Sequence, residues 1–285
     1  MDVRKLSHTV TDELCRKHNI YVWEMIQPVT VYKYDKEKKE MVPDCVKKIR
    51  VCPRCGQEAI DKSSEALDMK STLQHDLSKT YDVFYNKSII PSDLKDANYS
   101  TFTTSTQMDN HARNFGLRQN DFWFRQQGTG NALLSGHAGV GKSHLTLAIA
   151  KKLNDDFRAN GEPKSVLYIP IQQLFRKIKD GFDDKTNHEG KKLMELMKSV
   201  DFLFVDDLGK EATYQNEVRR VSDFKQEILY ELFDARSNSF INTNLSKDGL
   251  QKAYDKAVLS RMLKGAKGHT LFYPDTAEDK RVLPF

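Results

Sequence analysis

Residues 131–145 read Asn-Ala-Leu-Leu-Ser-Gly-His-Ala-Gly-Val-Gly-Lys-Ser-His-Leu. This stretch fits the phosphate-loop pattern G-x-x-x-x-G-K-[ST]. The fixed positions of the pattern are Gly136, Gly141, Lys142 and Ser143. A short apolar run precedes the loop, and apolar residues with helical spacing follow it. The sequence therefore predicts a strand, a phosphate-binding loop and a helix, in that order.

The composition of this loop suits an anion. Glycine has no Cβ and adopts positive φ, so the backbone can turn its N–H groups inward around a phosphate. The dipole of the following helix favours the same anion. We expect Lys142 to reach the β and γ phosphates of ATP or ADP, and the Ser143 hydroxyl to ligate Mg²⁺. The loop residues expected to contact the nucleotide are Gly136, His137, Ala138, Gly139, Val140, Gly141, Lys142, Ser143 and His144.

An apolar strand that ends in two carboxylates follows later in the chain, where residues 201–209 read Asp-Phe-Leu-Phe-Val-Asp-Asp-Leu-Gly. Open α/β sheets bind ligands at the carboxyl ends of their strands. Asp206 is expected to hold Mg²⁺ through water, and Asp207 to polarise the attacking water. Asn244, at the end of the next strand, is a candidate to orient that water. The alternatives are solvated loop acids and a turn-forming asparagine.

Strands and helices alternate after the phosphate loop. Further strands are predicted at residues 165–169 and 239–244, and helices at 171–180, 191–199 and 218–235. This alternation favours an α/β fold, with a parallel sheet covered by helices on both faces.

Composition sets broad limits. The chain has 285 residues, of which 39% are hydrophobic, enough for one large or two smaller domains. The net charge of +5 permits contact with nucleic acid but is equally that of an ordinary solvated surface. The chain shows neither a signal peptide nor an apolar run of membrane-spanning length, so we expect a cytoplasmic location.

All four cysteines lie within the first 55 residues. Cys52 and Cys55 form a C-x2-C pair, and Cys15 with His18 repeats the same spacing. These four residues supply ligands that Zn²⁺ prefers, and a tetrahedral zinc site is expected. Cys45 or His8 are alternatives to His18, and a pair of reduced, partly buried thiols is the alternative to a metal.

The same segment also predicts β structure. Apolar and polar residues alternate at 20–25 and 29–34, which indicates a hairpin with its charged turn at 36–40. A module of this size folds poorly without a metal. We expect three parts: a zinc-binding domain at 1–60, a helical or irregular linker at 61–95, and a nucleotide-binding domain at 96–285.

The order of these motifs resembles the AAA+ ATPases of the DnaC/DnaI helicase-loader group and the related IstB transposition ATPases. The likeness runs from residue 89 to the end of the sequence. Within it, residues 242–245 read Asn-Thr-Asn-Leu and residues 259–263 read Leu-Ser-Arg-Met-Leu. The N-terminal cysteine and histidine pairs resemble the zinc module of many loaders. The resemblance implies a P-loop NTPase domain with a five-stranded parallel sheet. Only 12 residues follow Tyr273, so we expect a reduced or absent C-terminal lid, as in this group.

The resemblance also assigns roles. Lys142 and Ser143 would form Walker A, Asp206 and Asp207 Walker B, and Asn244 sensor 1. Many AAA+ proteins end Walker B in Asp-Glu, whereas this chain has two aspartates. Because the aspartate side chain is shorter, it leaves the base farther from the γ phosphate, so slow hydrolysis is expected.

Two arginines complete the assignment. Arg261 would be an arginine finger that acts on a neighbouring subunit's ATP, which implies a homo-oligomer or a hexameric assembly on the helicase. Without the family, Arg261 would be interpreted as a surface cation. Arg281 falls where sensor 2 would contact the nucleotide.

The resemblance implies a loader that grips a DnaB-type replicative helicase through its N-terminal module and delivers it onto single-stranded DNA under control of ATP. Candidate DNA contacts are Phe175, Arg176, Lys177 and Lys179, an aromatic residue with basic neighbours. Burial of Phe175 in the core is the alternative. An IstB-like transposition ATPase, a non-enzymatic zinc adaptor and a plain DNA-binding module are the competing functions.

Overall fold

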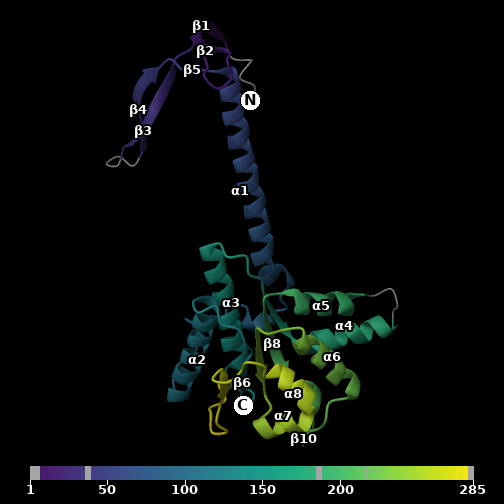
Figure 1. Ribbon diagram of the computed structural model, residues 1–285. Helices are drawn as coiled ribbons and strands as arrows, with labels where there is room; N and C mark the ends of the chain where they lie inside the picture. The colour runs from purple at the N-terminus through teal and green to yellow at the C-terminus, as the bar shows by residue number, and fades with distance from the viewer. Residues whose placement is uncertain (1–6, 36–39, 184–187, 216, 282–285) are drawn as a thin grey trace. The chain divides into compact units, whose positions relative to one another are not determined.

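The computed structural model describes residues 7–35, 40–183, 188–215 and 217–281 (Figure 1). The chain divides into two compact units, residues 1–75 and 76–285, and each is considered by itself. Helix α1 (Pro53–Lys87) begins in the first unit and ends in the second, and covers most of the segment predicted as a helical or irregular linker. Among the residues described, none of the helices combines the length and the apolar character that a membrane span needs.

The first unit is built from antiparallel strands. They are β1 (His8–Leu14), β2 (Tyr21–Met25), β3 (Val29–Asp35), β4 (Glu40–Lys47) and β5 (Arg50–Val51). The first sheet has the order β1-β2-β5, and β3 pairs with β4 as a separate hairpin. Both alternating stretches are strands, as predicted. They do not pair with each other. The hairpin about the predicted turn joins β3 to β4, with Asp35 opposite Glu40, and most of that turn lies outside the described residues.

This unit has little apolar core. Among its described residues, Val22 and Cys52 are the buried hydrophobic side chains. The hairpin side chains Tyr32, Tyr34 and Met41 are more than half exposed. Burial of apolar surface therefore contributes little to the stability of this unit, and a second source of stability is needed.

The second unit contains a parallel sheet of five strands. They are β6 (Ala132–Ser135), β7 (Val166–Pro170), β8 (Phe202–Leu208), β11 (Ser239–Thr243) and β12 (Thr270–Phe272). Their order is β12-β6-β11-β8-β7, and each neighbouring pair runs parallel. The predicted α/β class and five-stranded sheet are confirmed. Strands β9 (Thr213–Tyr214) and β10 (Glu217–Val218) form a short hairpin outside this sheet.

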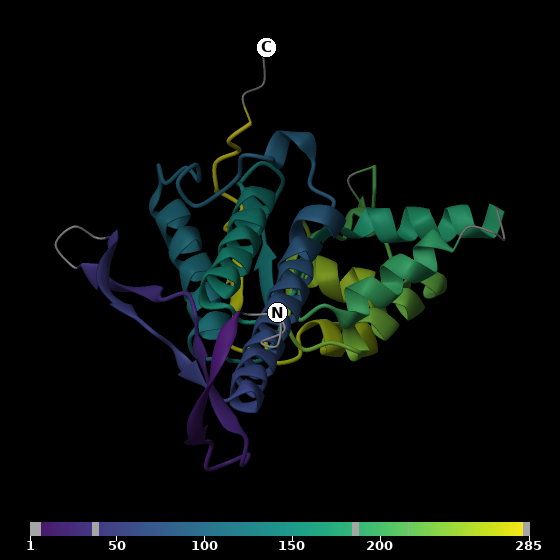
Figure 2. The same ribbon diagram turned by 90° about the horizontal axis from the view of Figure 1, so that it is seen from above.

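Helices cover both faces of the sheet (Figures 1 and 2). They are α2 (Gln107–Phe124), α3 (Lys142–Asn160), α4 (Ile171–Asp183), α5 (Glu189–Ser199), α6 (Asp223–Asp234), α7 (Lys247–Ala253) and α8 (Lys256–Met262). Alternate residues of β8 show the division, because Phe202 and Phe204 pack with α2 and α3, whereas Leu203 and Val205 pack with α4 to α8. Both faces are therefore buried, as in other parallel sheets. Described residues 273–281, after β12, contain no helix.

Candidate nucleotide and metal sites

The phosphate loop connects the end of β6 to the start of α3. Gly139 and Gly141 have φ values of +90° and +91°, a backbone conformation that residues with a Cβ rarely adopt. A Cβ at Gly139 would also collide with the carboxylate of Asp279. The glycines at these positions therefore allow the tight turn that places Lys142 at the first position of α3.

The loop meets the ends of two other strands. The Ser143 hydroxyl donates a hydrogen bond to Asp206 Oδ1 at 2.9 Å. Lys142 Nζ donates to Asn244 Oδ1 at 2.6 Å and to the carbonyl oxygen of His137 at 2.8 Å. Walker A, the first Walker B acid and the sensor candidate are thus brought together at the carboxyl ends of β6, β8 and β11.

Asp206 is held by partners that the sequence did not reveal. Tyr168 on β7 donates its hydroxyl hydrogen bond to Asp206 Oδ2 at 2.5 Å, and Asn242 on β11 donates to Oδ1. Despite these bonds, burial raises the pKa of Asp206. Burial also lowers the pKa of Lys142 to about 8, against the opposing effect of the two aspartates. A cation beside Asp206 and phosphates beside Lys142 would each favour the charged form, so these residues fit a magnesium-nucleotide.

Asp207 has an unusual backbone. Its φ is +58°, in the left-handed region, and its N–H donates to Asn242 Oδ1 at 2.9 Å. The pairing of β8 with β11 shifts register here, between Val205–Ile241 and Leu208–Thr243. The irregularity lets Asp206 lie buried while its neighbour Asp207 lines the cavity next to the loop.

That cavity has a volume of about 610 Å³. It is lined by most of the loop residues from Ala138 to His144 and by Asp207, Asn244 and Arg281. Leu94, Lys210 and Thr213 also line it and were not predicted. Of the other predicted loop residues, Gly136 and Val140 are buried, and the His137 ring lies 2.9 and 2.8 Å from the carbonyl oxygens of Ala138 and Ala277.

The segment after β12 runs along this loop. The Lys280 N–H donates to the Gly139 carbonyl at 3.0 Å, and the Lys280 ammonium pairs with the buried Asp109 carboxylate. Arg281 reaches the cavity but is held by Asp279, whose Oδ1 accepts from Arg281 Nε at 3.0 Å. This ion pair holds the pKa of Asp279 far below its usual value.

Arg261 lies apart from this cluster. Its Nε is 2.6 Å from Asp234 Oδ1, and its guanidinium lies 5.6 Å from the centre of the Tyr230 ring. Its backbone carbonyl accepts a hydrogen bond from Asn131, which precedes β6, whereas the phosphate loop follows β6. Arg261 is thus at the opposite end of that strand from its own subunit's loop.

The four DNA candidates on α4 do not form one surface. Phe175 is only 7% exposed and belongs to the core. Lys177 pairs with Glu189, whereas Arg176 and Lys179 are exposed. Phe175 is thus buried in the core, as in the alternative interpretation of this residue.

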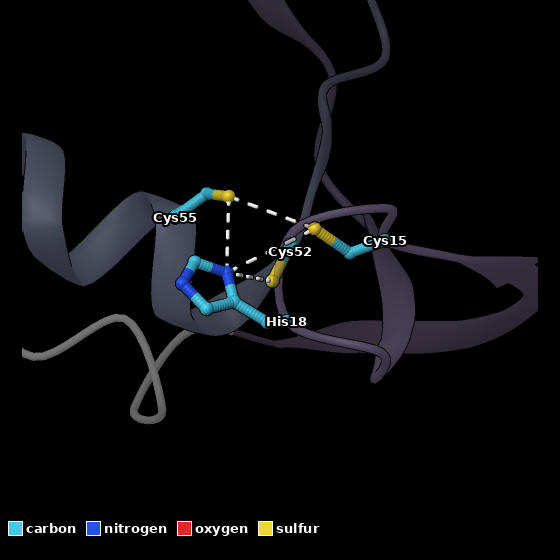
Figure 3. A group of neighbouring side chains, drawn as sticks. All are labelled: Cys15, His18, Cys52 and Cys55. Atoms are coloured by element: carbon cyan, nitrogen blue, oxygen red, sulfur yellow. Dashed lines mark hydrogen bonds between the residues drawn. The ribbon is translucent and has the colours of Figure 1, made fainter.

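The four predicted zinc ligands of the first unit converge (Figure 3). Cys15 Sγ is 3.7 Å from Cys55 Sγ, and the Nδ1 atom of His18 is 3.8, 3.6 and 3.3 Å from the thiols of Cys15, Cys52 and Cys55. In a tetrahedral site with Zn–S bonds of about 2.3 Å, neighbouring sulfur ligands are roughly 3.8 Å apart. The donor set and its spacing therefore fit Zn²⁺. Cys45 lies on β4 and the His8 ring stacks on Trp23, so His18 is the residue that completes the cluster.

A carboxylate supports the histidine of this cluster. His18 Nε2 donates to Glu58 Oε1 at 3.0 Å, while Nδ1 faces the thiols. A carboxylate on the far nitrogen fixes the tautomer and the orientation of a metal-binding imidazole. Glu58 also pairs with Lys17. It is a supporting residue that the sequence did not reveal.

Glu58→Gln is expected to weaken zinc affinity by roughly 10- to 100-fold, because the neutral amide supports the imidazole less strongly. Competition with a zinc chelator measures this. Glu65→Gln, an exposed carboxylate farther along the same helix, is the matched control and should leave the affinity unchanged. Equal affinities for the two variants would contradict the role of Glu58.

Comparison with known proteins places this chain in a family. The family described as IstB-like ATP binding protein matches residues 84–265. The chain belongs to this family. This IstB-like chain is also 26% identical to the replicative helicase loader DnaC of Buchnera aphidicola subsp. Baizongia pistaciae, over 74% of the chain and 76% of the relative. It is 30% identical to the replicative helicase loader DnaC of Buchnera aphidicola subsp. Schizaphis graminum, over 47% of the chain and 50% of that relative.

Solved structures of similar proteins include DnaI and the DnaC helicase loader. The DnaI structure has a TM-score of 0.46 at 23% identity and covers 68% of this IstB-like chain and 95% of its own. The DnaC structure has a TM-score of 0.48 at 19% identity, with 64% and 98% covered. The family match and the DnaC relatives confirm the resemblance that the motif order predicts.

Proposed function

We propose that this chain is an ATP-dependent helicase loader, which binds a DnaB-type replicative helicase and delivers it onto single-stranded DNA at replication initiation. The observation that carries the nucleotide part is the contact of Ser143 with Asp206 beside the buried Lys142. The loader part is supported by the relative named replicative helicase loader DnaC, which is similar over 74% of the chain.

In this proposal the loop residues and Lys142 hold the phosphates, and Ser143 and Asp206 hold Mg²⁺. The bound ion would neutralise charge that develops on the phosphates during hydrolysis of ATP to ADP and phosphate. Asp207 polarises the attacking water and Asn244 orients it. Because Asp207 is shorter than the common glutamate, turnover is slow, and the nucleotide acts mainly as a switch.

The arginine-finger role of Arg261 is part of the same proposal. Its position at the opposite end of β6 from the loop supports action on a neighbouring subunit's nucleotide. Its present partner Asp234 is half exposed, so the pair can exchange for a phosphate at a subunit interface. This requires a homo-oligomer or an assembly on the helicase.

The first unit is proposed to grip the helicase, with Zn²⁺ holding Cys15, His18, Cys52 and Cys55 together. Its scarcity of buried apolar side chains supports a structural role for the metal. Contact with DNA is assigned to the nucleotide-binding part, in the region of α4 where Arg176 and Lys179 are exposed. A loader acting on the chromosome works in the cytoplasm.

Size-exclusion chromatography of the chain mixed with a DnaB-type helicase tests the proposal. We expect co-elution, and ATP rather than ADP should allow transfer of the helicase onto single-stranded DNA, measured by unwinding of a forked substrate. Capture of a transposase instead of the helicase would favour the IstB-like alternative, which the family name supports. If the chain did not bind ATP, a non-enzymatic zinc adaptor would be the remaining candidate function.

A further inference from the structure

Residues 277–281, which follow β12, form a strap along the phosphate loop. The first of them places its carbonyl oxygen 2.8 Å from His137 Nε2. The Lys280 N–H donates to the Gly139 carbonyl at 3.0 Å. An added Cβ on Gly139 would lie 1.8 Å from Asp279 Oδ1, so the carboxylate of Asp279 contacts this glycine. The strap therefore brings a negative charge against the loop that is proposed to hold phosphates.

A buried ion pair fixes the strap in this place. The Lys280 ammonium pairs with Asp109, whose side chain is only 3% exposed. The same ammonium lies 5.0 Å from the centre of the Phe102 ring, which is a cation–π contact. Asp109 also accepts a hydrogen bond from the Thr106 N–H at 3.1 Å, in the cap of α2. Because Lys280 is held by both its backbone and its side chain, its neighbour Asp279 stays against the loop.

Asp279 binds the part of Arg281 that could hold a phosphate. Its Oδ1 accepts from Arg281 Nε at 3.0 Å, and its Oδ2 accepts from Nη2. Arginine holds phosphate groups in the same two-pronged way. The Arg281 side chain lines the nucleotide cavity. The carboxylate therefore occupies donors that a phosphate of the nucleotide would use.

The charges around the cavity indicate the effect of this ion pair. The lysine and arginine residues that line the cavity are Lys142, Lys210 and Arg281. Burial is the main cause that lowers the pKa of Lys142, and the charge of Arg281 acts in the same direction. These two cations are thus close enough to act on one ligand. Because Asp279 neutralises Arg281, a polyphosphate meets a weaker positive field than the three cations alone would give.

We propose that Asp279 is an internal competitor of the nucleotide, which holds Arg281 before ATP binds and gives it up to the phosphates afterwards. Exchange is possible because the pair is open to solvent, with 39% of the Asp279 side chain and 60% of the Arg281 side chain exposed. Asp279 thereby lowers the affinity for ATP while it keeps Arg281 beside the site. The inference deepens the proposed function and rests on nucleotide binding at this loop.

Asp279→Asn tests the competition. Asparagine has nearly the same shape, and its Oδ1 can still accept from the Arg281 N–H, so the charge is lost while this local bond is kept. Titration of the full chain with a fluorescent ATP analogue and Mg²⁺ should show binding about two- to fivefold tighter than in the wild type, the range for an exposed ion pair. Glu278→Gln removes an equal charge from the exposed neighbour and should bind as the wild type.

Salt dependence separates the effect of charge from a change in structure. The Debye length falls from about 10 Å at 0.1 M salt to about 3 Å at 1 M, so salt screens exposed charges. The gain in ATP affinity of the Asp279→Asn variant over the wild type should therefore disappear as salt is raised. A gain that persisted at high salt would come from a rearranged strap and would contradict the competition. The melting temperature should be unchanged, because the pair of Lys280 with Asp109 remains.

Weaker ATP binding by the Asp279→Asn variant would show that this carboxylate orients Arg281 for the phosphates, and it would overturn the inference. An unchanged affinity, or an equal gain in the Glu278→Gln variant, would overturn it as well. In each of these cases, ATP binding by the wild type would leave the proposed function standing. If the wild type itself did not bind ATP, the nucleotide part of the proposed function would fail together with this inference.

Discussion

Lys142→Ala is expected to abolish nucleotide binding while leaving the helicase interaction intact. Removing one partner of a buried charge pair costs about 2–5 kcal/mol, which corresponds to roughly 30- to 5000-fold in affinity. Lys142 is 5% exposed, and its ammonium group already donates to Asn244 and to the carbonyl of His137 in the loop. Titration with a fluorescent ATP analogue measures the loss.

Lys152→Ala is the control for this variant, because Lys152 lies on the same helix and pairs with Asp156 away from the cavity. It should bind ATP as the wild type. The Lys142 variant should also keep its melting temperature, because the cost of burying the ammonium group, which lowers its pKa, offsets its hydrogen bonds to Asn244 and His137. Retention of ATP affinity in the Lys142 variant would refute the assignment of the loop.

Removal of zinc is expected to unfold the first unit and to abolish helicase binding. Structural zinc contributes about 10–16 kcal/mol to small modules at neutral pH, and the described part of this unit buries few apolar side chains. Cys52→Ser should lose the metal, measured by elemental analysis, and should expose the unit to limited proteolysis. ATP affinity should persist, because the nucleotide site lies wholly in the second unit.

Cys45→Ser provides the matched control. Cys45 lies on β4, outside the group of ligand atoms within 4.8 Å of one another, and should be replaceable without loss of zinc. Zinc retained by the Cys52 variant but lost from the Cys45 variant would show that the metal binds elsewhere. Normal helicase binding by a zinc-free chain would show that the metal is not needed for docking to the helicase.

The phosphate loop and the acidic strand could be predicted because their signals are local. Gly141, Lys142 and Ser143 are consecutive, and the apolar run before Asp206 marks a buried strand. The approach of Ser143 to Asp206 follows from one general rule, since the carboxyl ends of parallel strands share an edge of the sheet. All neighbouring strands of the five-stranded sheet are parallel, so their carboxyl ends lie at the same edge.

Contacts between distant segments could not be predicted. Tyr168 and Glu211 read as an ordinary strand residue and an ordinary loop acid until the sheet brings their partners near. Lys280 pairs with Asp109 across 171 positions of sequence, with no pattern linking them. Strand β12 has three residues, too few to show a periodicity, so the fifth strand could be expected only from the family resemblance.

Some local patterns were also insufficient. Alternation identified β2 and β3 as strands, but it carries no information on partners, and β3 pairs with β4 instead. Apolar spacing suggested a helix from Val218, whereas Val218 belongs to β10 and α6 begins at Asp223. The apolar residues before and after Ser222 keep the helical spacing, although the helix itself begins only after Ser222.

The left-handed backbone at Asp207 bears on the difference between this chain and the Asp-Glu pair that ends Walker B in many AAA+ proteins. Aspartate tolerates that conformation better than longer side chains do, because its short carboxylate can bond locally. Lengthening the acid by one methylene would thus alter its reach and its backbone preference together. Replacement of Asp207 by glutamate is therefore constrained by the geometry of the strand end as well as by the reach of the acid.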